Sequence, residues 1–338
     1  MSTIFVKYVS KKTKCVQWFP TIDLATDRPR YFVTGSWDNR PQNEISLWQI
    51  EGEAEIEDLS KIQSVVTNGD INNLQFLKAD LLLAACSKKS VSVFQVSDNR
   101  LEHRNDIALS KEDICTSLIS RKDGLVVCGT EHGQIFAFTI ENSDKLQTLQ
   151  NEDDCVINDI QLADQHQVVA ATSSGQLKLW DLRDKGSKAQ LYVQENDWSA
   201  LWCIDKHPAQ QHVIAGGTSD GAICIWDLRQ PKLPSAKVEA HIGDVLDIQY
   251  HQSQPDHLFT CSSDGEIWHW DASNIQNSQD SQALSTPWLA CDTAKRRIEI
   301  TNLWQSYQLP INCLNVVNNS LIAGSDNEAL AICNIIIR

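Results

Sequence analysis

A histidine, a serine and an aspartate stand between residues 241 and 264, and these are the groups that nucleophilic hydrolases use. His241, Ser262 and Asp264 would serve in such a site as base, nucleophile and orienting acid. A catalytic set should occur once in a chain, because the chemistry is done at one place. The pattern around these residues occurs several times, so we predict that it is structural.

The repeated unit is clearest at residues 257–273, HLFTCSSDGEIWHWDAS, where a strand-like run, a Ser-Asp-Gly turn and a second strand end in Trp-Asp. The same order occurs at 212–229 (HVIAGGTSDGAICIWDLR) and at 167–183 (QVVAATSSGQLKLWDLR), with weaker copies earlier in the chain. The aromatic residues that end these strands recur every 42 to 46 residues: Trp48, Phe94, Phe138, Trp180, Trp226 and Trp270. Such a period predicts a WD-repeat β-propeller with one blade per repeat.

Within each blade, the Trp-Asp dipeptide at the end of the strand predicts a hydrogen-bonded cluster that joins the inner strand to the preceding loop. In the sixth blade the cluster would contain four residues whose polar groups satisfy one another: His241, Ser262, Asp264 and Trp270. The fifth blade repeats the six-residue spacing between turn acid and aromatic residue, and we assign the same structural role to three further residues: Asp220, Trp226 and Trp180.

The length of the chain fits one ring. A repeat of about 45 residues divides 338 residues into about seven blades, so residues 1–338 form a single all-β, seven-bladed propeller. We expect the first six blade cores at approximately 14–67, 70–110, 113–150, 155–196, 200–238 and 241–280. The seventh sheet would combine 311–335 with the N-terminal strand at 3–9, which closes the ring and removes a free sheet edge. Residues 273–310 would form a connector, and long insertions often carry binding.

The composition excludes several classes of function. The net charge of −15, from 44 acidic and 29 basic residues, would repel nucleic acid, and the basic residues are not gathered together. No apolar run approaches the ~18 residues of a membrane span, and no signal peptide is evident. The eleven cysteines are scattered without a CxxC pair, which predicts free thiols in a reducing compartment. We therefore expect no direct nucleic-acid binding and no membrane insertion.

The nine histidines do not form a metal motif. His207 and His212 stand five apart, but HPAQQH and HQSQPDH occupy equivalent turns of neighbouring repeats, and no acid or cysteine has ligand spacing. GxSxG, HExxH, a phosphate-binding glycine loop and a dinucleotide fingerprint are all missing from the sequence. We expect no enzymatic activity, no metal and no cofactor.

Three tryptophans outside the scaffold positions are candidates for binding a partner. Trp37 lies in the turn of the first blade, and Trp198 and Trp202 lead into the first strand of the fifth. Loops at these positions belong to one face of a propeller, where the three rings would form an aromatic anchor. The alternative is that they pack beneath the loops.

Some stretches are more specific than a general WD repeat: 34–50 (TGSWDNRPQNEISLWQI), 173–183 (SSGQLKLWDLR), 207–230 (HPAQQHVIAGGTSDGAICIWDLRQ), 257–273 and 294–301 (AKRRIEIT). In these stretches the chain resembles the family of forty-three-kilodalton nucleoporins, which are WD-repeat subunits of the Y-shaped scaffold complex of the nuclear pore. The resemblance runs from the first strand to the last blade, although the loops after blades two and six are shorter here.

The resemblance implies a non-enzymatic scaffold subunit, monomeric as a propeller within a hetero-oligomer. Its partners would be other nucleoporins of the Y-shaped complex, chiefly a helical-solenoid subunit of the short arm. It implies a location at the nuclear envelope, in the nuclear pore complex, and indirect roles in mRNA export and protein import. In dividing animal cells it also implies attachment of that complex to kinetochores.

A second hypothesis starts from the WDLR sequences at 180–183 and 226–229. In some propellers a Trp-Asp-x-Arg blade end recruits the adaptor of a cullin-RING ubiquitin ligase, and the propeller is then a substrate receptor. Arg183 and Arg229 would make that contact. The alternative is that arginine simply follows aspartate in many WD repeats.

Overall fold

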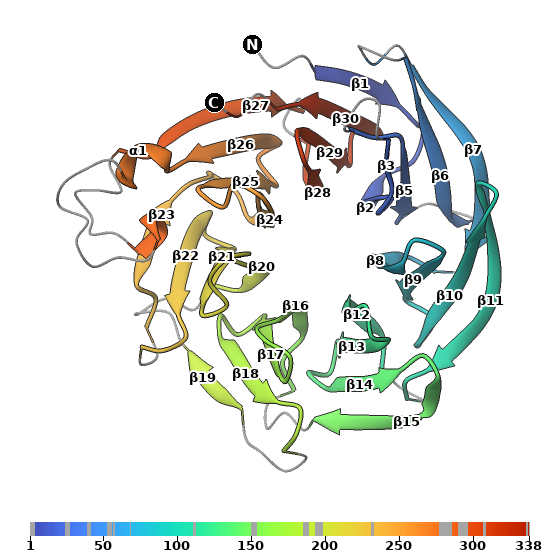
Figure 1. Ribbon diagram of the computed structural model, residues 1–338, viewed down its shortest axis with the longest axis horizontal. Coiled ribbons are helices and arrows are strands. Elements are labelled where there is room, and N and C mark those ends of the chain that lie inside the picture. The colour runs from blue at the N-terminus through green and yellow to red at the C-terminus, as the bar shows by residue number, and fades with distance from the viewer. Residues whose placement is uncertain are drawn as a thin grey trace.

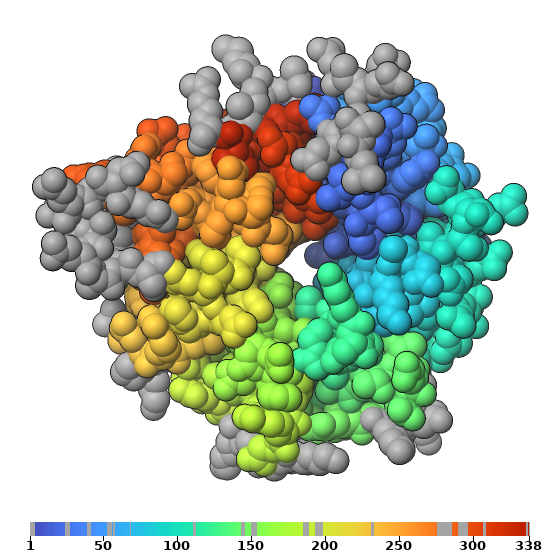
Figure 2. Space-filling model, viewed as in Figure 1, coloured from blue at the N-terminus to red at the C-terminus, as the bar shows by residue number. Residues whose placement is uncertain are grey.

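The computed structural model describes residues 4–23, 28–38, 42–52, 56, 58–67, 69–110, 113–149, 154–184, 189–192, 199–230, 233–276, 286–289, 297–306, 309–335 and 337. Its strands form seven four-stranded antiparallel sheets arranged as the blades of a ring (Figure 1). Viewed along the ring axis, the blades surround a central opening (Figure 2). The seven-bladed propeller that the repeat predicts is therefore confirmed. Within the described chain, no helix has the length and apolar character needed to cross a bilayer.

Each blade runs from an innermost strand at the central opening to an outermost strand at the perimeter. The innermost strands, in blade order, are β2 (Thr13–Trp18), β8 (Ile71–Lys78), β12 (Cys115–Ser120), β16 (Ile157–Leu162), β20 (Leu201–Lys206), β24 (Val245–Tyr250) and β28 (Ile311–Val317). The second strands are β5 (Tyr31–Ser36), β9 (Leu81–Cys86), β13 (Leu125–Thr130), β17 (Gln167–Thr172), β21 (Val213–Thr218), β25 (His257–Ser262) and β29 (Ser320–Ser325).

The third strands are β6 (Asn43–Glu51), β10 (Ser90–Ser97), β14 (Ile135–Thr139), β18 (Leu177–Asp181), β22 (Ala222–Asp227), β26 (Glu266–Asp271) and β30 (Ala329–Asn334). The outermost strands are β7 (Asp58–Thr67), β11 (Arg100–Ala108), β15 (Asn142–Leu149), β19 (Gln190–Tyr192), β23 (Ala236–Glu239), β27 (Glu299–Gln305) and β1 (Ile4–Tyr8). A small ribbon of β3 (Ile22–Asp23) and β4 (Arg28–Pro29) lies within the first blade's sequence.

The middle strands are buried on both faces because neighbouring sheets pack against each other. Every residue of β9 (LLLAAC) and β22 (AICIWD) is buried. Strands of this kind read as continuous apolar runs rather than as an alternation. The outermost strands differ, since β11 buries only Leu101 and Ile107 and exposes its other seven residues. The core therefore lies between the blades, and the perimeter is polar.

The N-terminal strand closes the ring, as the sequence predicts. β1 pairs antiparallel with β30, from Ile4 opposite Cys333 to Tyr8 opposite Ala329, and it is the outermost strand of the seventh blade (Figure 1). Lys7 then reaches the first blade, where its Nζ lies 2.6 Å from Asp58 Oδ1. The first and last segments of the chain thus share one sheet.

The sixth blade differs from expectation in its outer strand. We expected this blade to end near residue 280 and residues 273–310 to be a connector, but β27 is its fourth strand and pairs with β26. Between these strands lie α1 (Ser273–Gln276) and η1 (Pro287–Leu289). The buried Trp288 of η1 donates a hydrogen bond to Pro255 O at 2.8 Å. The physical reason is that a three-stranded blade would leave the outer edge of β26 unpaired.

Candidate functional site

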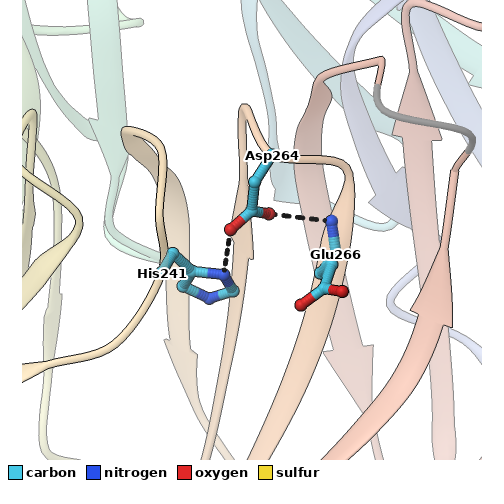
Figure 3. Close-up of side chains that lie close together, drawn as sticks. All are labelled: His241, Asp264 and Glu266. Atoms are coloured by element: carbon cyan, nitrogen blue, oxygen red, sulfur yellow. Dashed lines mark hydrogen bonds and ion pairs between the residues drawn. The ribbon is translucent and has the colours of Figure 1, made fainter.

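Two of the three candidate catalytic residues, His241 and Asp264, lie in a chain of hydrogen bonds in the sixth blade. His241 Nδ1 lies 3.1 Å from Asp264 Oδ2 (Figure 3), and His241 Nε2 lies 2.8 Å from the hydroxyl of Thr260. The indole N–H of Trp270 donates to the same hydroxyl at 3.0 Å. Both imidazole nitrogens of His241 are therefore engaged inside the protein.

The bonding order follows from what each group can donate. An indole N–H only donates, so the Thr260 oxygen accepts from Trp270. A carboxylate only accepts, so His241 Nδ1 carries the hydrogen that Asp264 accepts, and in that tautomer His241 Nε2 accepts the hydroxyl hydrogen of Thr260. The hydroxyl is fully buried and already holds a donor, so no substrate can reach it. The arrangement joins two strands and a loop and offers no nucleophile.

The structure corrects one member of the predicted cluster. We expected Ser262 to supply the hydroxyl, but its Oγ accepts the backbone N–H of Asp264 at 3.1 Å instead. Trp270 pairs across the sheet with Leu258, so Thr260 is its diagonal neighbour on the same face. The diagonal neighbour of the tryptophan is therefore the position that decides whether the cluster forms.

The same position explains the other blades. In the first blade it is Thr34, and the indole N–H of Trp48 donates to the Thr34 hydroxyl at 3.0 Å. In the fourth and fifth blades the position holds Ala170 and Gly216, which have no hydroxyl. Accordingly, in the described part of the chain, the indole N–H groups that end those blades have no acceptor: those of Trp180 and Trp226.

The turn acid of the fifth blade is held differently. Asp220 accepts hydrogen bonds from the Thr218 hydroxyl and from Lys237 Nζ, the latter at 2.9 Å. Burial opposes its ionisation, but these hydrogen bonds leave the pKa of Asp220 below its ordinary value. Asp220 and Trp226 belong to one blade, as expected, but no hydrogen bond joins them through a shared hydroxyl.

One group of side chains has the donor atoms of a metal site, counting only described residues: His241, Asp264 and Glu266 (Figure 3). Each of its acids already has a partner. Glu266 Oε2 accepts the indole N–H of Trp268 at 2.7 Å, and Asp264 accepts the backbone N–H groups of Ile242 and Glu266. Burial opposes ionisation of Asp264, yet its bonds to His241 and the backbone leave its pKa lowered. A cation would have to displace several of these bonds.

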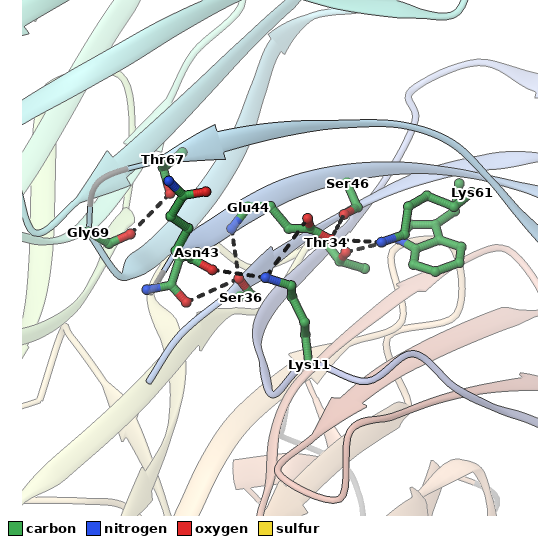
Figure 4. A network of polar contacts seen from close by, with 11 residues as sticks. Lys11, Thr34, Ser36, Asn43, Glu44, Ser46, Lys61, Thr67 and Gly69 are labelled. Atoms are coloured by element: carbon green, nitrogen blue, oxygen red, sulfur yellow. Dashed lines mark hydrogen bonds and ion pairs between the residues drawn. The ribbon is translucent and has the colours of Figure 1, made fainter. Parts of the chain in front are cut away.

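The first blade contains a second polar network, shown in Figure 4. Glu44 accepts hydrogen bonds from Lys61 Nζ at 2.7 Å and from the Ser46 hydroxyl at 2.9 Å. The Ser36 hydroxyl accepts the Glu44 backbone N–H at 2.8 Å and lies 3.2 Å from Asn43 Oδ1. Burial raises the pKa of Glu44, but Lys61 and Ser46 outweigh it and the pKa is lowered. These charges are paired within the blade.

Two of the three candidate partner-binding tryptophans line the same cavity at the mouth of the central opening. A cavity of about 490 Å³ lies there, with Trp37 and Trp202 among its lining residues. Trp37 donates its indole N–H to Asp326 Oδ1 at 3.0 Å, and Lys14 Nζ lies 5.3 Å from the ring centroid. Trp202 is exposed on the cavity wall. Trp198 lies outside the described residues.

The innermost strands are joined by side chains that reach from one blade to the next. The second residue of a strand supplies the donor, and Asn72, Asn158 and Asn312 bond the carbonyl oxygens of Cys115, Leu201 and Thr13 at 2.7, 2.8 and 2.9 Å. Thr116 does the same for Ile157. We call these contacts the inter-blade clips.

Farther along the opening, three carboxylates also join neighbouring blades, of which Asp205 is buried and Asp159 and Asp247 are half-buried. Asp159, Asp205 and Asp247 accept the backbone N–H groups of Ile204, Tyr250 and Leu314 in the following blades at 2.9, 2.7 and 2.9 Å. Burial raises the pKa values of Asp159, Asp205 and Asp247 to about 6, 7 and 8. Sequence reasoning missed these residues, although an aspartate inside an apolar inner strand was the available signal.

The two arginines of the WDLR sequences form local ion pairs. Arg183 bonds Asp181 through Nε and its terminal nitrogen, at 3.0 and 2.5 Å. Arg229 bonds Asp227 in the same way, at 2.9 and 2.6 Å. Both guanidinium groups are exposed but engaged by the aspartate two residues earlier. The WDLR pattern thus has a local structural explanation.

Comparisons with known proteins agree with this architecture. Residues 56–320 match the family described as the β-propeller of nucleolar protein 10-like proteins, N-terminal domain. The chain is 32% identical to nucleoporin Nup43 of Mus musculus over 98% of both chains. It is also 32% identical to nucleoporin Nup43 of Homo sapiens, again over 98% of both.

Proposed function

This chain belongs to the Nup43 family of nucleoporins, and we propose that it is a non-enzymatic scaffold subunit of the nuclear pore complex that binds other proteins through its surface. The observation that carries the proposal is the extent of the likeness, which covers 98% of this chain and 98% of each relative. Likeness over the whole propeller is stronger support than a shared repeat, because WD repeats alone occur in many unrelated proteins.

The polar groups of the chain support a platform rather than an enzyme. Three sets of residues resemble catalytic, metal-binding or ligase-binding sites, and each set forms hydrogen bonds or ion pairs within the chain. They are the hydrogen-bond chain of His241, the pair Asp264 and Glu266, and the two WDLR arginines. What remains available is a rigid ring with many independent loops. Such a ring suits protein binding.

Within the pore, the proposed partners are the other nucleoporins of the Y-shaped complex, chiefly a helical-solenoid subunit of its short arm. We propose that docking uses the face on which Trp37 and Trp202 line the cavity mouth. Roles in transport and at the kinetochore would follow from membership in that complex and not from chemistry of this chain.

The test is location and composition together. The gene is tagged at the C-terminal end, which leaves β1 free, and the tagged protein is imaged and purified at native abundance. The expected result is fluorescence at the nuclear rim and recovery of nucleoporins in stoichiometric amounts. Diffuse fluorescence without nucleoporins would contradict the proposal. Recovery of a cullin-RING adaptor that is lost in an Arg183→Ala, Arg229→Ala double variant would support a substrate receptor instead.

A further inference from the structure

The clip position holds Asn or Thr in blades two, three, four and seven, but Lys14 in blade one, Trp202 in blade five and Leu246 in blade six. The series is therefore interrupted in blade one and in the adjacent blades five and six. Leu246 has no donor, and the Val245 carbonyl that a clip from blade five would reach accepts the Cys203 thiol at 3.4 Å instead. Trp202 and Leu246 both line the cavity at the mouth of the opening. Two adjacent blades therefore give up a stabilising contact and present apolar groups to the cavity.

Further apolar side chains are exposed beside the interruption in blades five and six. Ile242, in the loop before β24, is 99% exposed, and Leu309, in the loop before β28, is 44% exposed, compared with 36% for Trp202. Their close neighbours Asp244 and Pro310 line the same cavity. Trp202, Ile242, Leu246 and Leu309 thus belong to three consecutive blades on one face. We call these four residues the apolar rim.

The charges beside the apolar rim are mainly negative. Asp244 and Asp326 line the cavity, whereas Lys14 is the single cation among its described lining residues. Lys14 lies against the ring of Trp37, in the first blade. The net charge of the chain, −15, has the same sign as the cavity mouth. A ligand at this place gains from carrying positive charge.

We propose that the apolar rim and these carboxylates form a docking site for an extended segment of a partner protein, in which an apolar side chain is flanked by lysine or arginine. The apolar side chain would enter the cavity beside Trp202 and Leu246 and pack against Ile242. The flanking cations would pair with Asp244 and Asp326. A cavity of about 490 Å³ is in the range in which proteins bind small ligands, and so suits a few side chains.

Other occupants fit less well. Nucleic acid would be repelled by the carboxylates at the mouth. A second copy of this chain would bring the same negative charge to the same face. An acidic partner segment would bring further negative charge to the carboxylates at the cavity mouth. The site gives the docking role inferred above a position on the molecule, and in that respect it rests on the proposed function.

The experiment is a selection against the purified full-length chain. A phage library of random twelve-residue peptides is first depleted on an Ile242→Ser, Trp202→Ser double variant and then captured on the native protein. The expected result is enrichment of peptides that combine leucine, isoleucine or an aromatic residue with lysine or arginine and contain few acids. No enrichment after depletion, or enrichment of acidic peptides, would overturn the proposal.

The best enriched peptide is then measured by fluorescence polarisation against single variants. Ile242→Ser and Trp202→Ser should each weaken binding about tenfold or more, as removal of an interface anchor does, and Asp244→Asn about threefold at physiological salt. The matched control is Ile300→Ser, which removes a 49% exposed isoleucine from the outer strand β27 and should leave the affinity unchanged. If Ile300→Ser weakens peptide binding as much as Ile242→Ser or Trp202→Ser does, the proposed docking site is wrong. Unchanged melting temperatures show that the variants fold.

The outcomes separate the two proposals. If the tagged chain localises to the nuclear envelope but no selected peptide depends on the apolar rim for binding, the docking site is rejected and the scaffold function is kept. If peptides depend on the apolar rim for binding but the tagged chain is absent from the nuclear envelope, the scaffold function is rejected and the docking site is kept.

Discussion

At the scale of single residues, one hydroxyl decides whether the aromatic end of a blade is tied down. The Thr260 hydroxyl bonds both Trp270 and His241, and the Thr34 hydroxyl accepts the indole N–H of Trp48. Alanine or glycine at this position leaves a buried indole N–H without a partner, which costs free energy. The blades that end in tryptophan therefore differ in whether the indole N–H has an acceptor.

We predict that Thr260→Val destabilises the protein by about 1–3 kcal/mol, because it leaves a buried indole N–H and an imidazole nitrogen unsatisfied while keeping the shape of the side chain. Ser262→Ala should cost less, since the Ser262 hydroxyl bonds only the Asp264 backbone N–H. Urea unfolding of the two variants measures the difference. If Ser262→Ala lowers the free energy of unfolding more than Thr260→Val does, Ser262 and not Thr260 is the central hydroxyl of the cluster.

Most of the fold, but less of the site, could be predicted from sequence at this scale. The spacing of Asp264 and Trp270 located the cluster because repeats preserve it. Thr260 was missed because a diagonal contact depends on strand register, and register requires counting pairs outward from the turn. The sequence indicated Trp202 as a candidate for binding but could not decide between exposure and packing beneath a loop, since exposure depends on how the neighbouring blade packs.

At the scale of the element, the innermost strands hold one another through polar side chains. Asp205 of β20 accepts the N–H groups of Lys206 and of Tyr250, which lies in β24. Burial raises its pKa to about 7, and the nearby Asp159 adds to this, whereas the backbone hydrogen bonds and Lys206 oppose it. The native protein therefore holds a proton here that the unfolded chain has released between about pH 4 and pH 7.

The pH dependence follows from that sign. The contribution of Asp205 to stability is greatest at low pH and falls as the pH rises through about 7. We expect the stability difference between the native protein and Asp205→Asn to shrink from pH 5 to pH 8 by up to about 2 kcal/mol, as measured by urea unfolding. The control Asp181→Asn should show no such change in this range, because Arg183 lowers the pKa of Asp181 to about 2. A difference that grows with pH would refute the assignment.

The outer strands were harder to predict than the inner ones. β27 was assigned to a connector because its chain leaves β26 through α1 and η1 and not through a short turn. β19 and β23 span only Gln190–Tyr192 and Ala236–Glu239, and such short, largely polar strands carry a weak pattern. Inner strands were predictable because burial on both faces demands apolar residues.

At the scale of the whole molecule, the ring depends on one shared sheet. β1 covers the outer edge of β30, and Phe5 packs beside the hydrophobic cluster of Trp18 and Phe32 between the last and first blades. Lys7 bonds Asp58 and the carbonyl of Leu59 in the neighbouring blade. One short strand therefore both caps a sheet edge and joins two blades.

Deletion of residues 1–9 should lower the melting temperature by several degrees and cause self-association, because β30 then presents an unpaired edge. Calorimetry and light scattering after size-exclusion chromatography measure the two effects. The single variants Phe5→Ser and Tyr8→Ser give a matched pair, since Phe5 packs inside and Tyr8 is largely exposed. Only Phe5→Ser should lower the melting temperature of the protein. If the deletion variant is monomeric and as stable as the native protein, closure of the ring does not depend on β1.

The shared sheet also sets an order of events during synthesis. The ribosome makes β1 before any other described strand, whereas its partner β30 (Ala329–Asn334) is the last described strand. At about 5–20 residues per second, the N-terminal strand must wait on the order of tens of seconds before its hydrogen-bonding partner emerges. Until β30 emerges, β1 lacks the strand with which it pairs in the folded protein, and nascent-chain chaperones have that interval in which to bind it.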